Sequence, residues 1–379
     1  MARIIIISNR LPVTVEKYKD KLAYRPSVGG LATGMSSLQK DYECLWVGWP
    51  GIDRDQLNSK ERVSLVKELG KMGNYPVFLS QAHIEGYYNG FCNKTIWSLF
   101  HCFTQFTIYE NHLWETYRQV NQIFCQTILD IIKPNDLIWV HDYHLMLLPL
   151  LLRKRMPDLN IGFFLHIPFP PSEIFRLLPW RRELLEGLIG ADLIGFHTYD
   201  YVQNFLDSLL RICGYENSLS FINYQNRIVK VDSFPMGIDF DHFHNSSKQE
   251  EVKQEIKKIK NKIGKNKVIV SVDRLDYTKG ILERLKAFST FLEDNPEYWE
   301  KVIMIQVAVP SRIDVPQYQQ LKQQVDEMIG YVNGRFGTIG WSPIWYLYRS
   351  IPFPELAALY YLGDIALVTP LKDGMNLVA

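Results

Sequence analysis

The sequence has little net charge, few cysteines and no long apolar run. Its 379 residues carry 42 Lys and Arg against 41 Asp and Glu, a net charge of +1. Broad nucleic-acid and anionic-membrane surfaces are therefore not expected, and recognition of a charged ligand must depend on a few placed residues. The longest apolar run, Leu145–Leu152, contains Pro149 and is far shorter than the roughly 20 residues that span a bilayer.

The cysteines give no disulfide or zinc pattern. The five thiols are Cys44, Cys92, Cys102, Cys125 and Cys213. They are odd in number, widely spaced and without a Cys-x-x-Cys pair, which favours reduced thiols in a cytoplasmic protein. The N-terminal apolar stretch, Ile4–Ile7, is too short for a secretory signal. We expect a protein that is neither exported nor membrane-spanning.

Short β-branched and aromatic runs alternate with amphipathic stretches in the first part of the chain. The expected strands are Arg3–Ser8, Asp136–His141, Ile161–His166, Leu193–His197 and Ile228–Phe234. The expected helices include Glu110–Ile132 and Asp200–Ile212. This alternation predicts an α/β fold, with a parallel sheet covered by helices on both faces.

The pattern breaks at Pro235–Asp239 and then restarts. The lysine-rich segment Lys248–Lys267 has apolar residues at helical spacing, which favours a solvated helix over a polyanion site. The later expected strands are Val268–Val272, Val302–Val309, Phe336–Ile339 and Ile365–Thr369. We predict two Rossmann-like domains, 1–237 and 238–379, with a cleft between facing sheet edges. Ligands would bind beyond the carboxyl ends of the strands.

Candidate residues in the first domain follow the expected strands. Arg10 ends the first strand, where an arginine either pairs with a carboxylate or grips an anion. Gly29-Gly30 would let backbone N–H groups approach a ligand, although such a pair is often only a turn. Tyr88 and Trp97 either stack on a sugar ring or simply pack, and the sequence favours neither.

His141-Asp142-Tyr143-His144 follows another strand. A metal site is disfavoured because no second ligand cluster stands out and a divalent metal needs several converging ligands. Hydrogen bonding of Asp142 to sugar hydroxyls suits the position better. His166 ends the next strand, and its place at the same sheet edge favours function over a core role.

In the second domain, Arg274 and Lys279 lie at a strand-to-helix junction, with the helix expected to begin near Thr278. Two cations and a helix N-terminus suit a diphosphate. A salt bridge to Asp273 or Asp276 would explain one cation more easily than both. Arg312 follows another apolar strand, and Asp373-Gly374 is expected to turn into a helix with free N–H groups.

Seven motifs together resemble trehalose-6-phosphate synthases, the retaining glycosyltransferases of family 20. They are Ser-Asn-Arg, Gly-Gly-Leu, Tyr-Tyr-Asn-x-Phe, His-Asp-Tyr-His-Leu, Gly-Phe-Phe-Leu-His-Ile-Pro-Phe-Pro, Arg-Leu-Asp-Tyr-Thr-Lys-Gly and Asp-Gly-Met-Asn-Leu-Val-Ala. Their order is that of the family, and the match runs over Arg3–Ala379. The resemblance implies a GT-B fold, with an acceptor domain (1–237) and a nucleotide-sugar domain (238–379).

The resemblance also implies the reaction and its residues. Glucose would pass with retention from UDP-glucose to glucose 6-phosphate, and no cofactor or metal is expected. The implied acceptor residues are Arg10, Tyr88, Trp97, Asp142 and Arg312. The implied donor residues are Gly29, Gly30, His166, Arg274, Lys279, Ile351, Leu356, Asp373, Met375, Asn376, Leu377 and Val378. The implied catalytic residues are Asp142, His166, Arg274 and Lys279. The chain shows no obvious carboxylate pair of the kind that a retaining hydrolase uses.

The sequence departs from the family pattern in one place, and two alternatives to the synthase function stay open. Family members continue with Lys-Glu, whose glutamate binds the donor ribose, so we expect residues 1–379 alone to bind UDP-glucose poorly and to aggregate. A sister enzyme such as a glucosylglycerol-phosphate synthase, or a non-catalytic sugar-phosphate-binding subunit, would share many of these motifs. A homo-oligomer, or partnership or fusion with a trehalose-6-phosphate phosphatase, is an expected association. The donor base is not fixed by the sequence.

Overall fold

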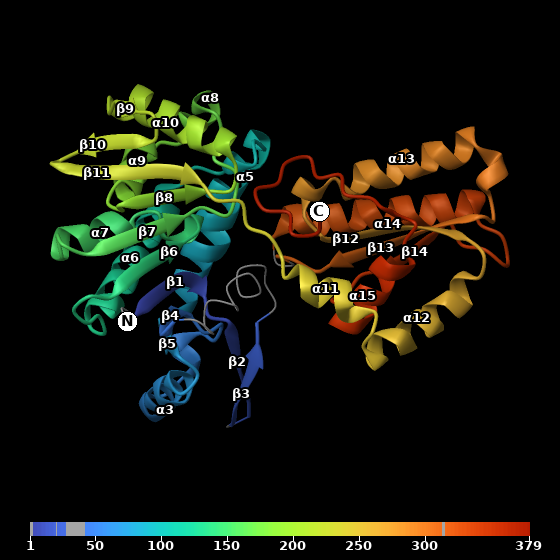
Figure 1. Cartoon of the computed structure of the whole chain (residues 1–379), viewed down its shortest axis with the longest axis horizontal. Helices are drawn as coiled ribbons and strands as arrows, with labels where there is room; N and C mark the ends of the chain where they lie inside the picture. The colour runs from blue at the N-terminus through green and yellow to red at the C-terminus, as the bar shows by residue number, and fades with distance from the viewer. Residues whose placement is uncertain (1–2, 20, 28–41, 313–314) are drawn as a thin grey trace. The chain divides into compact units, whose positions relative to one another are not determined.

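The structure is a computed structural model that describes residues 3–19, 21–27, 42–312 and 315–379 (Figure 1). The chain divides into two compact units, Met1–Gly237 and Ile238–Ala379. Within the described ranges, no helix combines the length and the apolar character that a membrane crossing requires.

A nine-stranded sheet forms the centre of the first unit. Its strand order is β5-β4-β1-β6-β7-β8-β11-β10-β9, and pairing is parallel except where β10 meets β11 and β9. The strands are β1 Ile4–Arg10, β4 Cys44–Trp49, β5 Asn74–Pro76, β6 Leu137–His141, β7 Asn160–Phe164, β8 Leu193–Phe196, β9 Asn217–Ser218, β10 Phe221–Tyr224 and β11 Arg227–Ser233. Ile5, Ile6 and Ile7 of β1 are fully buried, as expected of a strand covered on both faces. A separate hairpin pairs β2 Val13–Tyr18 with β3 Lys21–Pro26.

Helices follow the strands of this unit. They are α3 Ser59–Gly70, α4 Gln81–His83, α5 Trp97–Phe100, α6 Asn111–Leu129, α7 Leu148–Arg155, α8 Ser172–Phe175, α9 Arg181–Leu188 and α10 Tyr199–Cys213. The segment Ile84–Ile96 between α4 and α5 is a π-helix. Such wide helical turns are rare and are frequent at functional sites.

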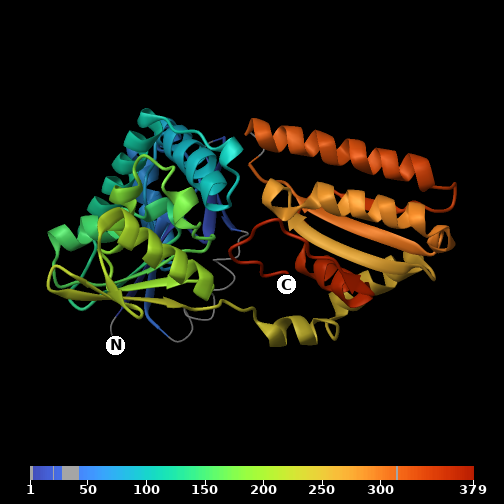
Figure 2. The same ribbon diagram turned by 90° about the horizontal axis from the view of Figure 1, so that it is seen from above.

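The second unit is a smaller α/β layer structure. Its sheet has the order β14-β13-β12-β15 and is parallel throughout. The strands are β12 Lys267–Arg274, β13 Val302–Val309, β14 Ile344–Leu347 and β15 Ile365–Ala366. The helices are α11 Phe240–Ser246, α12 Glu250–Ile263, α13 Ile281–Asp294, α14 Pro316–Phe336 and α15 Phe353–Leu362. Figure 2 shows α13 and α14 on one face of this sheet, with α12 and α15 on the other.

The predicted strands of the first unit are confirmed to within a few residues, as are the helices around α6, α10 and α12. The prediction of a strand at Phe336–Ile339 is wrong. The apolar series Leu321, Val325, Ile329, Val332 keeps the helical period up to Phe336, which ends α14. The strand comes later, as β14.

Two other predictions near the end of the chain need correction. The strand expected at Ile365–Thr369 is only Ile365–Ala366. No helix follows Asp373 within residues 371–379, which form bends and turns.

The start of one helix also differs from the prediction. The helix expected to begin near Thr278 begins at Ile281, because a short 3-10 turn, Tyr277–Lys279, capped by Asp276, comes first.

Candidate functional site

Arg10 lies at the carboxyl end of β1 as a largely buried cation. Its guanidinium stands 4.5 Å from the ring centre of Trp49, and Nη2 donates weakly to Thr14 Oγ1 at 3.4 Å. No carboxylate pairs with it among the residues that the structure describes. Burial lowers the pKa of Arg10. A desolvated guanidinium that meets no carboxylate in this part of the chain suits an anionic ligand.

Gly51 makes room for this guanidinium. A Cβ at Gly51 would lie 2.7 Å from Arg10 Nη2, and the residue has φ +92°, where side chains are strained. Its backbone conformation favours glycine, and a side chain here would also push the Arg10 guanidinium out of its observed place. Gly51 was not among the predicted site residues.

Tyr88, in the π-helix, connects Arg10 with the segment after β6. Its ring lies 6.2 Å from that of Trp49 and stacks at 5.9 Å on His144. Trp97 is 5% exposed. Its ring centre lies 4.1 Å from that of His101 and 5.9 Å from that of Tyr143. Contact of Trp97 with a sugar stays a prediction.

Asp142 has an unusual backbone. It follows β6 with φ 73° and ψ 168°, a region that is essentially restricted to glycine. Its N–H donates to the Phe164 carbonyl at 2.7 Å, and Oδ1 accepts the N–H of His166 at 3.3 Å. Oδ2 lies 3.8 Å from His144 Nδ1. The surrounding strands therefore hold the Asp142 carboxylate at the sheet edge on a strained backbone. Strained backbone of this kind clusters at functional sites.

His166 and His141 form a buried imidazole pair. His141 Nδ1 and His166 Nε2 are 3.0 Å apart, so one nitrogen donates and the other accepts. Burial, and then the nearby His197, lower the pKa of His166 to about 3. Burial, and then His166, lower the pKa of His141 well below its usual value. Both rings are neutral near pH 7 and can hydrogen-bond uncharged hydroxyls.

This pair predicts a loss of stability in acid. The unfolded state binds protons at these imidazoles below about pH 6.5, while the folded state does not. The free energy of unfolding should therefore fall as pH drops from about 6.5 towards 3, by up to about 1.4 kcal/mol per pH unit from His166. Denaturant unfolding at several pH values measures the slope. A His166→Gln variant should have a shallower slope, and an unchanged slope would contradict the assignment.

In the second unit, cations gather beyond the carboxyl ends of two neighbouring strands. Arg274 ends β12 and pairs in register with Val309, the last residue of β13. Arg274 is exposed. Lys279 is 7% exposed, and its Nζ is ion-paired with Asp373. Arg312 follows β13 on the same side.

The two carboxylates considered as partners of Arg274 and Lys279 each form an ion pair with another arginine. Asp273 pairs with Arg284 at 2.9 Å, and Asp276 pairs with Arg312 at 3.0 Å. Arg284 is 2% exposed and also contacts Ser271, Gln306, Thr369 and the carbonyl of Lys279. Arg284 was not among the predicted site residues, although a single arginine within the apolar series of α13 could have indicated it.

The chain after β15 packs on the Tyr277–Lys279 turn. Leu371 N–H donates to the Thr278 carbonyl at 2.8 Å. Gly280 has φ +61°, and a Cβ there would lie 2.5 Å from the Thr369 carbonyl oxygen. This close approach places Asp373 beside Lys279. Asn376 Oδ1 accepts the N–H of Val378 at 3.1 Å.

The structure thus forms two groups of predicted residues, one in each unit. Arg10, Tyr88, Trp97, Asp142 and His166 belong to the first unit. Arg274, Lys279, Arg312, Ile351, Leu356, Asp373, Met375, Asn376, Leu377 and Val378 belong to the second. Arg312, expected among acceptor residues, therefore lies in the second unit with the predicted donor residues. Gly29 and Gly30 lie outside the described residues.

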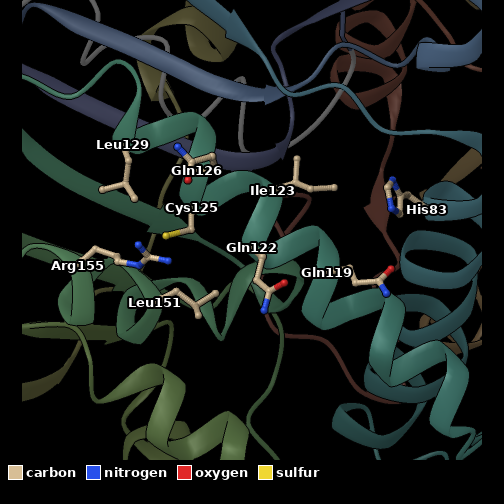
Figure 3. A pocket seen from close by; sticks show the side chains of 9 residues that line it. All are labelled: His83, Gln119, Gln122, Ile123, Cys125, Gln126, Leu129, Leu151 and Arg155. Carbon is tan, nitrogen blue, oxygen red and sulfur yellow. The ribbon is translucent and has the colours of Figure 1, made fainter.

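A hollow of about 620 Å³ on the first unit is a different place (Figure 3). Its lining comes mainly from the second halves of α6 and α7, and includes Cys125, Leu151 and Arg155. Those helices lead into the amino ends of β6 and β7, whereas ligands of such sheets bind at the carboxyl ends. None of the predicted site residues lines it.

No cluster of three or more His, Cys, Asp or Glu side chains suited to a metal ion occurs in the described part of the chain. The cations of the second unit at this place include Arg274, Lys279 and Arg312. Positive charge beside a diphosphate can stabilise a leaving group electrostatically.

Comparisons with known proteins identify the family. The family model of glycosyltransferase family 20 matches residues 2–379. A bifunctional trehalose-6-phosphate synthase/phosphatase of Thermoproteus tenax is 47% identical, over 100% of this chain and 52% of that protein. A UDP-forming alpha,alpha-trehalose-phosphate synthase of Pichia angusta is 47% identical, over 99% of this chain and 81% of that protein. The chain thus spans about half the length of the first relative.

A solved structure shows the same architecture. It is an alpha,alpha-trehalose-phosphate synthase (UDP-forming) from Burkholderia xenovorans in complex with glucose-6-phosphate, with 32% identity and a TM-score of 0.87. The match covers 100% of this chain and 81% of that one. The predicted fold class, α/β with two parallel sheets of the GT-B type, is confirmed. The chain belongs to glycosyltransferase family 20.

Proposed function

We propose that the protein transfers glucose from UDP-glucose to glucose 6-phosphate with retention, giving trehalose 6-phosphate and UDP. The observation that carries the proposal is the buried guanidinium of Arg10, which has no carboxylate partner among the described residues and lies near Tyr88. It suits the phosphate of an acceptor. The relatives support the substrates, since one is named as UDP-forming and another holds glucose-6-phosphate.

The chemistry assigns separate roles to the two groups of residues. The bond between the anomeric carbon and the diphosphate oxygen breaks, and the acceptor oxygen bonds to that carbon on the same face. The acceptor proton passes to the leaving phosphate oxygen. Arg274 and Lys279 stabilise the negative charge that develops on the diphosphate. Asp142 and the neutral His166 hold sugar hydroxyls.

The remaining assignments complete this proposal. Arg10, Tyr88, Trp97, Asp142 and Arg312 bind the acceptor. Ile351 and Leu356 border the base, while Gly29, Gly30, Asp373, Met375, Asn376, Leu377 and Val378 contact the donor sugar and its phosphates. In this proposal 1–237 is the acceptor domain and 238–379 the nucleotide-sugar domain, with Arg312 contributing to the acceptor from the second domain and Gly29, Gly30 and His166 contributing to the donor from the first.

The deciding experiment is UDP release from UDP-glucose, measured with and without glucose 6-phosphate. Release should depend on the acceptor. Glycerol 3-phosphate tests the sister-enzyme alternative, and ADP-glucose and GDP-glucose test the donor base. Sugar-phosphate binding without any turnover would favour the non-catalytic alternative.

Chelation is expected to leave the activity unchanged. The leaving-group charge is met by Arg274 and Lys279, so exhaustive EDTA treatment should not lower the rate. The same UDP assay measures this. If magnesium or manganese restored activity that EDTA had removed, His141, Asp142 and His144 would have to be reconsidered as ligands.

Arg10→Ala should weaken the binding of glucose 6-phosphate much more than the binding of UDP. Losing a charge-assisted contact to phosphate should raise the dissociation constant roughly tenfold or more. Gly51→Ala should act in the same direction, because its Cβ would displace the Arg10 guanidinium. Calorimetry with each ligand provides the comparison. Equal losses for glucose 6-phosphate and UDP would contradict the acceptor role of Arg10.

The cellular setting is part of the same proposal. Five dispersed cysteines without a Cys-x-x-Cys pair favour a reducing compartment, and we place the protein in the cytoplasm. The product is a phosphate monoester, and one relative is named as a synthase/phosphatase. A trehalose-6-phosphate phosphatase, fused or separate, is therefore the natural partner.

A further inference from the structure

One buried carboxylate in the second unit joins two cation-bearing segments. The side chain of Asp276 is 0% exposed. Its Oδ1 accepts the N–H of Thr278 at 3.0 Å, which caps the turn that carries Lys279. Its Oδ2 accepts from Arg312 Nη1 at 3.0 Å and from the Tyr318 hydroxyl at 2.9 Å. Both oxygens are therefore used, each towards a different segment.

Arg312 is held firmly by this arrangement. Its side chain is 7% exposed, and its backbone has φ +46°, a left-handed conformation that is uncommon outside glycine. Nη1 also contacts the Tyr318 hydroxyl, and the guanidinium lies 5.4 Å from the Tyr318 ring centre. Burial, and then Asp276, raise the pKa of Tyr318. The hydroxyl thus stays protonated and donates to Asp276.

The two segments belong to one edge of the sheet. The turn Tyr277–Lys279 follows β12, and Arg312 follows β13, its parallel neighbour. Nothing in the strand pairing itself fixes a loop arginine against that turn. The Asp276 carboxylate supplies a direct link, because it is bonded to both, and the Tyr277 ring packs beside it on Tyr318 at 5.4 Å between ring centres.

We propose that Asp276 is a positioning residue that holds Arg312 against the Tyr277–Lys279 turn, so that the cations after β12 and β13 keep a fixed position relative to one another. The inference rests on the proposed function, in which Arg312 contacts the acceptor phosphate and Lys279 the donor diphosphate. Asp276 touches neither substrate. It acts on the acceptor through Arg312 and on the donor through the turn.

Two substitutions separate these two links. Asp276→Asn keeps an oxygen for the Thr278 N–H, since asparagine caps as well as aspartate does. Its amide NH₂, however, faces the donors of Arg312 and Tyr318, so the Arg312 link is lost. Asp276→Ala loses both links. The pair of variants therefore distinguishes positioning of Arg312 from general support of the turn.

The experiment measures kcat and both KM values for the unmodified protein, Asp276→Asn, Asp276→Ala, Arg312→Ala and the double variant Asp276→Asn/Arg312→Ala. Asp276→Asn should raise KM for glucose 6-phosphate about tenfold or more and leave KM for UDP-glucose within about threefold. Asp276→Ala should raise both. The double variant should match Arg312→Ala, because a residue that acts through Arg312 has no further effect once Arg312 is gone.

The outcomes separate this inference from the proposed function. No turnover by the unmodified protein with glucose 6-phosphate overturns the function and the inference together. If Asp276→Asn has normal turnover and an unchanged KM for glucose 6-phosphate, the inference alone is overturned. The inference is also overturned if the fold-increase in KM for glucose 6-phosphate in the double variant equals the product of the fold-increases in the two single variants. Asp276 would then act independently of Arg312. Thermal unfolding of each variant shows whether a raised KM reflects loss of the folded protein.

Discussion

Replacing Arg274 or Lys279 by alanine should lower kcat at least about a hundredfold while leaving the fold intact. Each side chain is assigned to the diphosphate, where negative charge develops as the glycosyl bond breaks. Removing one preorganised electrostatic contact of this kind typically costs a factor of about 100 to 1,000. UDP release under saturating substrates measures the change. Near-normal turnover by both variants would contradict the assignment of this pair.

The structure sharpens the test for Lys279. Its Nζ is ion-paired with Asp373 in a largely buried place, so Lys279→Ala also leaves a carboxylate without its partner. Lys279→Ala/Asp373→Ala removes both charges and should remain inactive even if its stability recovers. Lys286→Ala, an exposed lysine on α13, is the matched control and should keep normal turnover. Loss of activity that tracked stability alone would point to a structural pair.

The sheet strands were predictable because a fully covered parallel strand is a continuous apolar run. β13 shows this most clearly, since Val302–Val309 is predicted and observed with the same bounds. β4, Cys44–Trp49, carries the same signal and could have been found. The error at Phe336–Ile339 has a physical cause. Phe336 is the last residue of α14 and residues 337–339 form the turn after it, and a four-residue window cannot distinguish a strand from such a helix end.

The candidate site was predictable in its location but not in its pairing. Strand ends place Arg10, Asp142 and Arg274 at sheet edges, and this follows from the order of elements. The ion-pair partners of the site residues do not follow from that order. Lys279 meets Asp373, 94 residues away, and Asp276 meets Arg312, 36 residues away. Such contacts depend on how the loops pack after the sheet has formed.

The backbone of Asp142 was equally invisible in the sequence, and it predicts a separation of stability from activity. Asp142→Gly and Asp142→Ala both remove the carboxylate, so both should lower turnover by roughly a hundredfold or more. Only glycine relieves the strain at φ 73° and ψ 168°. Strain of this kind costs about 1–3 kcal/mol, less the extra freedom that glycine has in the unfolded chain.

We therefore expect Asp142→Gly to have a free energy of unfolding about 1–2 kcal/mol above that of Asp142→Ala, with both variants equally inactive. Denaturant unfolding and UDP release measure the two quantities on the same samples. Asn135, an exposed turn residue with φ 69°, is the matched control. Asn135→Gly should also be more stable than Asn135→Ala, yet both should keep normal turnover. Equal stability of the two Asp142 variants would mean that the strain at this position is not real, and activity in either would remove Asp142 from the catalytic group.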